Sequence, residues 1–385
     1  MKQAQRVLLI RNVMPEFYGG GETYQLLLAK ELIKNNLTPV IVTSSKKLLL
    51  EAKKQKIEAV KCPFLRQQNW SGAKNLLLPK YLIWQKYLEM WYRFIFKKYC
   101  PIAINIQSRD DWLAATKVAR RMRIKVLWTD HMDFRSWVLQ NVKVKCKNVI
   151  GKKILKEARR VDKIIFISDF ERENFERLVK PILFDNLLTI KNGVEDKYNE
   201  FNMVREKKGS ICYLGRLVDY KGVRELIEAF LIVSKKNQNI ILNIYGDGDD
   251  RKKYQELANG NNRIVFYGQT DKPLKKLAEN EFFVLPSYKE GLSLSLLDAA
   301  MMKKTIIASD VDGNPEVVEN GVSGLLVPAK NIERLAEAME KVLVEPKLAK
   351  KLAQGARKKY ENEFDFKQIF VKKMLPLYNS EKEKK

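Results

Sequence analysis

Residue types that support particular chemistries are scarce in this chain of 385 residues. It has one histidine, His131, and four cysteines that are widely spaced and form no C-x-x-C pair. Scattered cysteines argue against a disulfide framework and against a cysteine-ligated zinc site. They favour a reducing compartment, and we therefore expect a cytoplasmic protein.

Long apolar runs are also lacking. No stretch approaches the roughly 18 apolar residues that a membrane-spanning helix needs. The run Val7–Ile10 near the N-terminus is too short for a secretory signal peptide, and Arg11 follows it at once. The sequence therefore predicts no membrane-spanning helix and no secretory signal.

Acidic residues are too few to balance the basic ones, because 72 Lys and Arg face 46 Asp and Glu, for a net charge of +26. Such a charge attracts nucleic acid, anionic lipid or phosphorylated substrates, or it only keeps the protein dispersed. A nucleic-acid-binding module would interleave aromatic and basic residues on an exposed surface. We find this only in residues 81–99, which we interpret first as a helix packed on a sheet. The alternative is a membrane-surface helix, which would make an anionic membrane surface a partner and the protein peripheral. No nucleic-acid partner is expected.

What the chain does have is a regular alternation of short apolar runs and longer amphipathic stretches. This alternation predicts an α/β protein with two doubly wound, Rossmann-like domains that face each other across a cleft. The polar stretch Glu195–Ser210 is the expected linker, which gives domains at 1–195 and 209–362. The expected strands are continuous apolar runs, typical of parallel strands buried on both faces. They are 7–12, 39–45, 102–107, 125–131, 163–168, 187–193, 210–216, 240–247, 264–269, 281–287, 305–310 and 324–328.

Glycines follow the first expected strand. In GGGE (19–22), Gly20 and Gly21 let backbone N–H groups approach a ligand at a helix N-terminus, where an anion is favoured. The alternative is a flexible turn. The pattern is not G-x-G-x-x-G, and no acidic residue ends the second strand near Thr43, which argues against a dinucleotide-dependent dehydrogenase.

A second group of candidates follows the strand at 210–216. Gly215 ends that strand, and Arg216 and Lys221 in GRLVDYKG can reach one point beyond it. Two cations suit a pyrophosphate, although surface cations are equally expected in so basic a chain. Gly246 in YGDGDD permits a tight turn at the same rim. His131 follows another strand, where it is either a structural residue or part of the site.

The stretch SYKEGLSLSLLDAAMMKK (287–304) carries two carboxylates. Glu290 and Gly291 lie in a loop after a strand, and a helix is expected from Ser293 that contains Asp298. The N–H groups of Leu292, Ser293 and Leu294 at its start can bind phosphate. Carboxylates on either side of a phosphate site can accept hydrogen bonds only from hydroxyls. A ligand with ribose, diphosphate and sugar fits this pattern, so we expect a nucleotide sugar.

The order of these motifs resembles glycosyltransferase family 4 of the GT-B fold over nearly the whole chain. The resemblance rests on GGGE, GRLVDYKG, YGDGD, PSYKEGLSLSLLDA and GNPEVVENGVSGLLV (313–327). It implies a C-terminal helix at about 365–380 that packs back on the first domain. It also implies that Arg216 and Lys221 clamp the diphosphate and that Glu290 contacts sugar hydroxyls.

The resemblance assigns three further roles. Asp298 would hold the ribose hydroxyls, and Gly20 and Gly21 would touch the distal phosphate and sugar. His131 would line the donor sugar, with its backbone carbonyl stabilising positive charge at the anomeric carbon. The family usually has Glu at the position of Asp298, which is shorter by one methylene group. A direct ribose contact would then need a helix shift or a water.

The resemblance implies a retaining glycosyltransferase with a nucleotide-sugar donor, UDP first and GDP next, and no metal or other cofactor. The acceptor would be a glycan or a lipid-linked molecule of cell-surface polysaccharide or glycolipid synthesis. Two alternatives share the fold: a nucleotide-sugar epimerase and a catalytically silent binding protein. The first would need several titratable groups in the site, and the chain has a single histidine.

Overall fold

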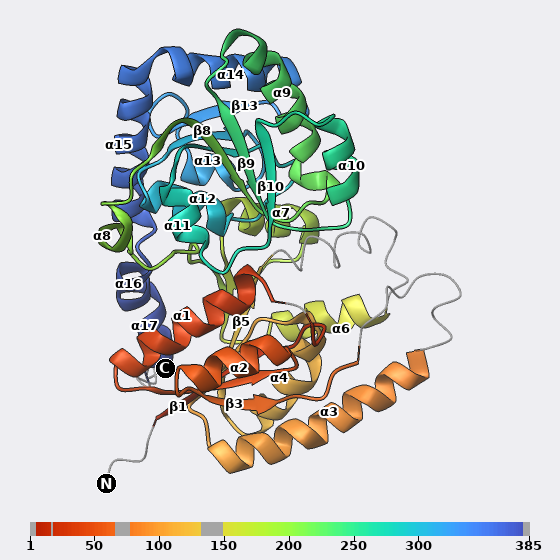
Figure 1. Cartoon of the computed structure of the whole chain (residues 1–385). Helices are drawn as coiled ribbons and strands as arrows, with labels where there is room; N and C mark the ends of the chain where they lie inside the picture. The colour runs from red at the N-terminus through yellow and green to blue at the C-terminus, as the bar shows by residue number, and fades with distance from the viewer. Residues whose placement is uncertain (1–4, 17, 66–77, 132–148, 380–385) are drawn as a thin grey trace. The chain divides into compact units, whose positions relative to one another are not determined.

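The chain folds into two compact units (Figure 1). The first unit contains Met1–Ile190 and Phe370–Lys385, and the second contains Lys191–Ile369. The computed structural model describes residues 5–16, 18–65, 78–131 and 149–379.

The described part of the first unit contains a seven-stranded sheet in the order β3-β2-β1-β4-β5-β6-β7. All neighbouring strands pair in parallel. The strands are β1 (Arg6–Arg11), β2 (Thr38–Thr43), β3 (Glu58–Lys61), β4 (Ala103–Ile106), β5 (Lys125–Asp130), β6 (Lys163–Phe166) and β7 (Leu187–Thr189). The helices are α1 (Gly20–Lys34), α2 (Lys46–Lys54), α3 (Leu78–Tyr99), α4 (Trp112–Arg121), α6 (Val149–Ala158), α7 (Asp169–Val179) and α17 (Leu375–Tyr378).

The second unit, described in full, contains a six-stranded parallel sheet in the order β10-β9-β8-β11-β12-β13. The strands are β8 (Lys207–Leu214), β9 (Ile241–Tyr245), β10 (Ile264–Gly268), β11 (Asn280–Leu285), β12 (Thr305–Ser309) and β13 (Leu325–Val327). The helices are α8 (Tyr198–Phe201), α9 (Val223–Lys236), α10 (Arg251–Leu257), α11 (Pro273–Ala278), α12 (Leu294–Met301), α13 (Asn314–Val317), α14 (Ile332–Val344), α15 (Pro346–Glu363) and α16 (Phe366–Ile369).

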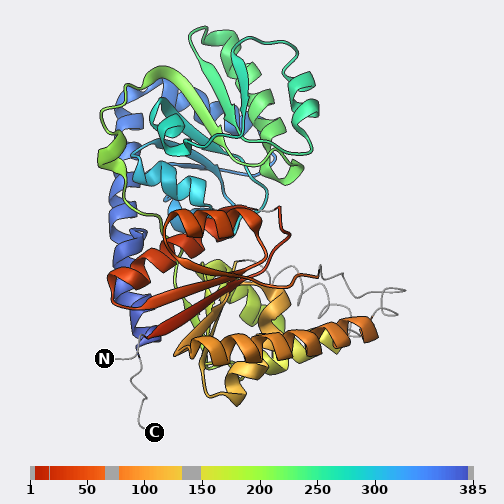
Figure 2. The same ribbon diagram turned by 60° about the horizontal axis from the view of Figure 1, so that its bottom comes forward.

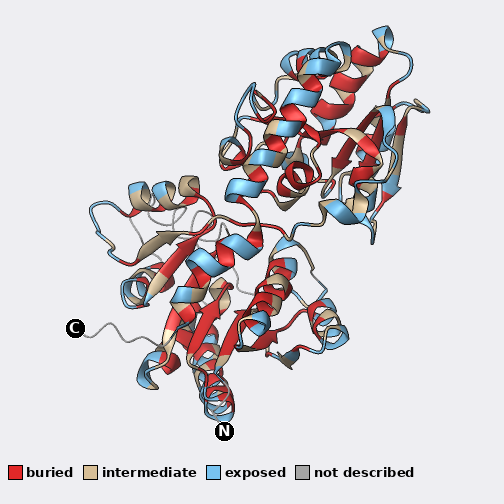
Figure 3. Ribbon diagram, turned by 90° about the vertical axis from the view of Figure 1, so that its left-hand side faces the viewer, coloured by how far each residue is buried: buried red, intermediate tan, exposed pale blue. Residues whose placement is uncertain are grey.

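The central strands of both sheets are buried on both faces, as their apolar runs predict (Figure 3). In each sheet the strand order reverses beside the first strand of the unit, between β1 and β4 and between β8 and β11. Ligands of doubly wound sheets bind beyond the carboxyl ends of the strands at such a reversal. The residues that follow these four strands are therefore the candidates for a ligand-binding site.

One strand, β3, was not predicted from the sequence. It lies at the edge of the first sheet, and its residues are exposed or half-buried. Edge strands need no continuous apolar run, and Glu58–Lys61 shows none. The periodicity of the chain therefore carries no signal for this strand.

The division between the units differs from the predicted boundaries. It falls after Ile190, so the expected linker lies inside the second unit, where it forms α8 and the start of β8. This segment is tied to α15, because Tyr360 donates to the carbonyl of Val194 at 2.9 Å and Arg357 pairs with Asp196. The second unit also continues past 362, to Ile369.

The last described residues belong to the first unit, where the Tyr378 hydroxyl accepts a hydrogen bond from Asn105 Nδ2 of β4 at 2.8 Å. A π-helical turn, Phe370–Met374, precedes α17. Lys125 of β5 also donates to the carbonyl of Leu377 at 3.0 Å. The C-terminal segment therefore covers strands of the first sheet (Figure 2).

A buried carboxylate joins the strand ends of the first unit. Asp111 is fully buried and accepts hydrogen bonds from Tyr92 of α3 at 2.5 Å, Ser108 at 2.5 Å and Asn12 at 2.9 Å. Burial raises the pKa of Asp111, and the three donors oppose that rise. Because Asn12 follows β1 and Ser108 follows β4, the carboxylate fixes the two strands that flank the reversal.

We expect Asp111→Ala to lower the free energy of unfolding by more than about 3 kcal/mol, because three buried donors lose their acceptor. Urea denaturation, followed through the unfolding transition of the first unit, measures this free energy. Asp185→Ala removes an exposed carboxylate from the same unit and serves as the control. Equal stabilities for the two variants would show that Asp111 is not a structural anchor.

Candidate active site

Two loops of the second unit lie against each other beyond β8 and β11. Tyr288 in the β11–α12 loop donates its backbone N–H to the carbonyl of Tyr220 in the β8–α9 loop at 2.8 Å. Gly222 has a φ of +68°, and a Cβ there would lie 2.0 Å from the carbonyl oxygen of Pro286. Only glycine fits this left-handed position and this close approach. The contact brings the side chains of both loops to one point.

Lys221 and Glu290 meet at that point. Lys221 Nζ lies 2.5 Å from Glu290 Oε1, and the two side chains are only 15% and 8% exposed. Ser287 Oγ also donates to Oε1, at 2.8 Å. Within the fully described second unit, Glu290 Oε2 has no hydrogen-bond donor. One carboxylate oxygen is therefore held by the protein, and the other remains available to a ligand hydroxyl.

Arg216 lies on the same loop and is exposed. Its guanidinium donates to the hydroxyl of Tyr220 and stands 5.6 Å from the centre of that ring. Lys221 Nζ is 5.7 Å from the same ring centre. Tyr220 therefore contacts both predicted phosphate-binding cations through its π face or hydroxyl.

The N-terminus of α12 follows Glu290 and has no side-chain cap, because Ser293 Oγ contacts Ser295 Oγ at 3.1 Å instead. The helix begins at Leu294, one residue after the predicted start. In the second unit, no acceptor lies within hydrogen-bond reach of the N–H groups of Leu292, Ser293 and Leu294. Uncapped N–H groups at a helix start are a site for an anion.

Gly215 and Gly246 bring the ends of β8 and β9 together. Gly215 donates to the carbonyl of Tyr245 at 3.0 Å. Gly246 has a φ of +140°, and a Cβ there would lie 1.8 Å from the carbonyl oxygen of Gly215. Both glycines therefore shape the loop that carries Arg216, which is a more specific role than the tight turn predicted for Gly246.

Asp298 is half-buried on α12, and no described residue of the unit donates a hydrogen bond to its carboxyl. Burial raises the pKa of Asp298 to about 7, and the positive charge of Lys197 opposes the rise. Ligand hydroxyls can donate hydrogen bonds to such a carboxyl group. These bonds would supply its missing partners and favour its ionised form.

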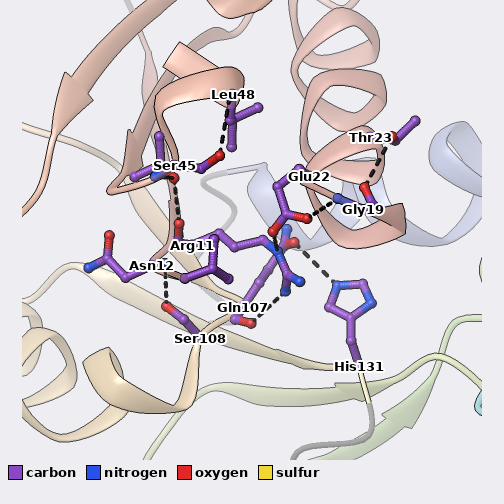
Figure 4. A network of polar contacts seen from close by, with 12 residues as sticks. Arg11, Asn12, Gly19, Glu22, Thr23, Ser45, Leu48, Gln107, Ser108 and His131 are labelled. Carbon is purple, nitrogen blue, oxygen red and sulfur yellow. Dashed lines mark hydrogen bonds and ion pairs between the residues drawn. The ribbon is translucent and has the colours of Figure 1, made fainter. Parts of the chain in front are cut away.

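In the first unit, the predicted glycines open α1. Gly20 and Gly21 are its first two residues, and Glu22 accepts from the N–H of Gly19 at 2.7 Å. Glu22 is fully buried and lies 2.5 Å from Arg11 Nε, at the end of β1 (Figure 4). This ion pair fixes the glycine-rich start of the helix to the strand.

His131 follows β5 and lies near the same ion pair. Its Nε2 is 3.2 Å from Gln107 Oε1, while Arg11 donates to the backbone carbonyl of Gln107 at 3.1 Å (Figure 4). The ring also packs edge-on against Tyr24, with centroids 5.2 Å apart. Burial lowers the pKa of His131 to about 3, and the charge of Arg11 acts in the same direction. The imidazole is therefore neutral near pH 7 and is not a general acid there.

The structure thus gathers Arg216, Lys221, Glu290 and the start of α12 in the second unit, and Gly20, Gly21 and His131 in the first. Residues that sequence reasoning missed are Arg11, Glu22, Gln107, Tyr220, Gly222 and Ser287. Gly222 and Ser287 are next to predicted motif residues, and Arg11 is a charge at the end of an apolar strand. Gln107 and Tyr220 have no comparable signal.

Two features are absent from the residues that the structure describes. No three His, Cys, Asp or Glu side chains there come together in a way that could hold a metal ion. None of the described helices has the length and apolar character to cross a bilayer.

We expect Lys221→Met to weaken nucleoside diphosphate binding by about tenfold or more, because one charge-assisted contact is worth roughly 1.5–3 kcal/mol. Its melting temperature should also fall, since Glu290 loses its counter-ion in a buried site. Adding Glu290→Gln should restore stability but not binding. Calorimetric titration and thermal denaturation measure the two effects.

Arg224→Met is the matched control for Lys221, because Arg224 is an exposed cation at the start of α9. It should bind the nucleotide as the unchanged protein does. If Lys221→Met bound the nucleoside diphosphate with wild-type affinity, Lys221 would not be part of the binding site.

Asp298 should make stability depend on pH in a defined direction. Its pKa of about 7 in the folded state lies above the ordinary value of 3.8, so between these values the folded state holds a proton that the unfolded state has released. Stability is then lost as pH rises from about 4 to 7 and is level above that. Asp298→Asn has no carboxyl to titrate, so its melting temperature should rise relative to that of the wild type over the same interval. A constant difference between the two proteins from pH 5 to 8 would contradict the raised pKa.

Known proteins match the chain in sequence and in fold. The model described as Glycosyltransferase Family 4 matches residues 18–198, and the one described as Glycosyl transferases group 1 matches residues 194–359. An uncharacterised glycosyltransferase of Methanocaldococcus jannaschii is 30% identical over 237 residues, which is 57% of this chain and 58% of that protein. The capsular polysaccharide biosynthesis glycosyltransferase CapM of Staphylococcus aureus is 27% identical over 206 residues, or 52% of each chain. The chain spans about half the length of the curated relatives it matches.

Solved structures share the fold over nearly the whole chain. A glycosyltransferase from Rickettsia africae has a TM-score of 0.76 at 21% identity, with 97% of this chain and 98% of that chain covered. TarM has the same TM-score at 15% identity, with 98% and 99% covered. Together with the two family models, these matches confirm the resemblance and the two Rossmann-like domains of the GT-B fold. The chain belongs to the group 1 glycosyltransferases of family 4.

Proposed function

We propose that this protein transfers a sugar from a nucleoside diphosphate sugar, with UDP as the nucleotide, to a glycan or a lipid-linked acceptor. The observation that carries this is the Lys221–Glu290 pair beyond β8 and β11, beside Arg216 and the uncapped start of α12. It supplies cations and N–H groups for a diphosphate, and a carboxylate oxygen for sugar hydroxyls.

The proposed reaction breaks the bond between the anomeric carbon and the diphosphate oxygen, and the bonding electrons stay on that oxygen. Lys221, Arg216 and the N–H groups at the start of α12 stabilise the negative charge that develops there. The acceptor oxygen bonds to the anomeric carbon from the same face, and its proton passes to the leaving phosphate. This path gives retention and needs neither a metal nor a protein nucleophile.

The remaining residues position the donor. Glu290 Oε2 accepts from sugar hydroxyls, and Asp298 accepts from the ribose. The neutral His131 can offer its ring and backbone carbonyl to the sugar without adding a competing charge. Gly20 and Gly21, at the start of α1, leave room for the distal phosphate.

Relatives support the donor and acceptor classes. The Anabaena protein HepE, which shares the fold at a TM-score of 0.73, is described in complex with UDP and glucose. A Campylobacter jejuni relative, 31% identical over 183 residues, is named for transfer to a sugar on diphospho-undecaprenol. We extend UDP and a lipid-linked or polymeric surface glycan to this chain. We also propose that it acts in the cytoplasm, peripherally at the membrane where a lipid-linked acceptor resides.

The test is incubation of the protein with UDP-glucose, UDP-galactose, their N-acetylamino forms and GDP-mannose, with EDTA present. One donor should raise the melting temperature and release its nucleotide, slowly to water and faster with an added glycolipid acceptor. Proton NMR of the first product should show the α anomer, as retention requires. Arg216→Met should abolish release, and Arg224→Met should not.

The alternatives give different products. An epimerase would change the sugar without acceptor or nucleotide release, and a silent protein would bind without turnover. An initial β anomer would overturn retention, and loss of activity in EDTA would overturn metal independence.

A further inference from the structure

Helix α3 has an apolar face that packs in the first unit. The helix runs from Leu78 to Tyr99, about 33 Å at 1.5 Å per residue, along the outside of the unit in both views (Figures 1 and 2). Its buried side chains face α4 and the core. They are Tyr81, Leu88, Tyr92, Ile95, Phe96 and Tyr99.

A second apolar face lies on the opposite side of the same helix. Ile83 is 71% exposed, Tyr87 48%, Met90 73% and Phe94 65%. At about 100° per residue these four positions fall within roughly 60° of arc, centred opposite the buried face. An exposed stripe of large apolar side chains three turns long marks an interaction surface rather than a solvated face.

Cations border this stripe on both sides. Lys80 and Lys98 lie along one edge, and Lys86, Arg93 and Lys97 lie along the other, all exposed. The single acid of the helix, Glu89, is only partly exposed and lies 2.7 Å from Lys117 of α4 and 3.8 Å from Lys86 at the edge of the stripe. The exposed face therefore carries apolar and basic side chains and no acid.

Basic residues of neighbouring helices extend the same border. A cavity of about 530 Å³ adjoins Leu82, Ile83 and Lys86 of α3 and is also lined by Lys117 of α4 and by Lys153 and Lys156 of α6. Glu89 and Glu157 line it as well, so four lysines face two carboxylates there. An excess of positive charge beside an apolar stripe complements a layer of anionic head groups over acyl chains.

We propose that α3 is a membrane-docking element that lies flat on an anionic bilayer. Ile83, Tyr87, Met90 and Phe94 enter the boundary between head groups and acyl chains, and the bordering lysines and arginine contact lipid phosphates. A second copy of the chain is a poorer occupant, because pairing two such faces brings the same five cations of each together. The inference extends the proposed lipid-linked acceptor, but it rests on the described residues of the first unit alone.

The test is sedimentation of the full-length protein with vesicles of phosphatidylcholine, with and without about 30% phosphatidylglycerol. The protein should partition at least tenfold more strongly to the anionic vesicles, and binding should fall as salt rises. Met90→Gln with Phe94→Gln should reduce partitioning about tenfold. Lys86→Gln with Arg93→Gln and Lys97→Gln should reduce it similarly.

Matched controls separate the helix from the net charge. Lys252→Gln with Lys253→Gln and Lys275→Gln removes three exposed charges from the second unit, and Leu183→Gln removes a side chain that is 85% exposed on the first. Both controls should bind as wild type does. Nucleoside diphosphate titration of each variant, without vesicles, keeps this test distinct from that of the transferase.

Three outcomes would overturn the inference. Wild-type protein could stay in the supernatant with anionic vesicles at low salt. The control charge variant could lose as much binding as the α3 charge variant, or the apolar variant could lose none. A fourth outcome would also overturn it: a dimer that forms without lipid and that Met90→Gln with Phe94→Gln dissociates would assign the face to a second copy.

Discussion

The Lys221–Glu290 ion pair is the interaction on which the candidate donor site depends. A carboxylate that is only 8% exposed requires a counter-ion, and its partner comes from the loop of a different strand. The pair therefore joins the β8–α9 and β11–α12 loops, and the close approach at Gly222 makes room for it. The same pair that stabilises the loops also presents one free carboxylate oxygen and a partly neutralised cation to a ligand.

The first unit also has a buried ion pair that joins two segments of the chain. Arg11 and the buried Glu22 join β1 to the start of α1, as Lys221 and Glu290 join two loops in the second unit. Here the fixed positive charge lies near His131 and adds to the effect of burial in keeping the ring neutral. The second unit thus has exposed and half-buried cations beyond its strand ends, while the first has a neutral imidazole beside a buried ion pair.

Much of this arrangement could be predicted from the sequence, because parallel strands carry their signal in continuous apolar runs and the motifs follow those runs. The strand ends placed Arg216, Lys221, Glu290 and His131 correctly at the rims of the sheets. β3 could not be predicted, since an edge strand needs no apolar run. The partners Gln107 and Tyr220 could not be predicted either, since they act through contacts that only the folded loops create. The division after Ile190 differs from the predicted linker, because a polar segment resembles a linker even when an ion pair attaches it to α15.

Helix α3 shows how one sequence pattern can be interpreted in two ways. Its aromatic and aliphatic content predicted a helix packed on the sheet, and one face is packed against α4 and the core. Folding needs only that face, because a stripe of about 100° suffices to bury a helix against a core. The apolar residues on the opposite face therefore do not contribute to the folding of the unit, and they lower its solubility while they are exposed. Their retention between two rows of cations is explained by a surface outside the protein that is both anionic and apolar.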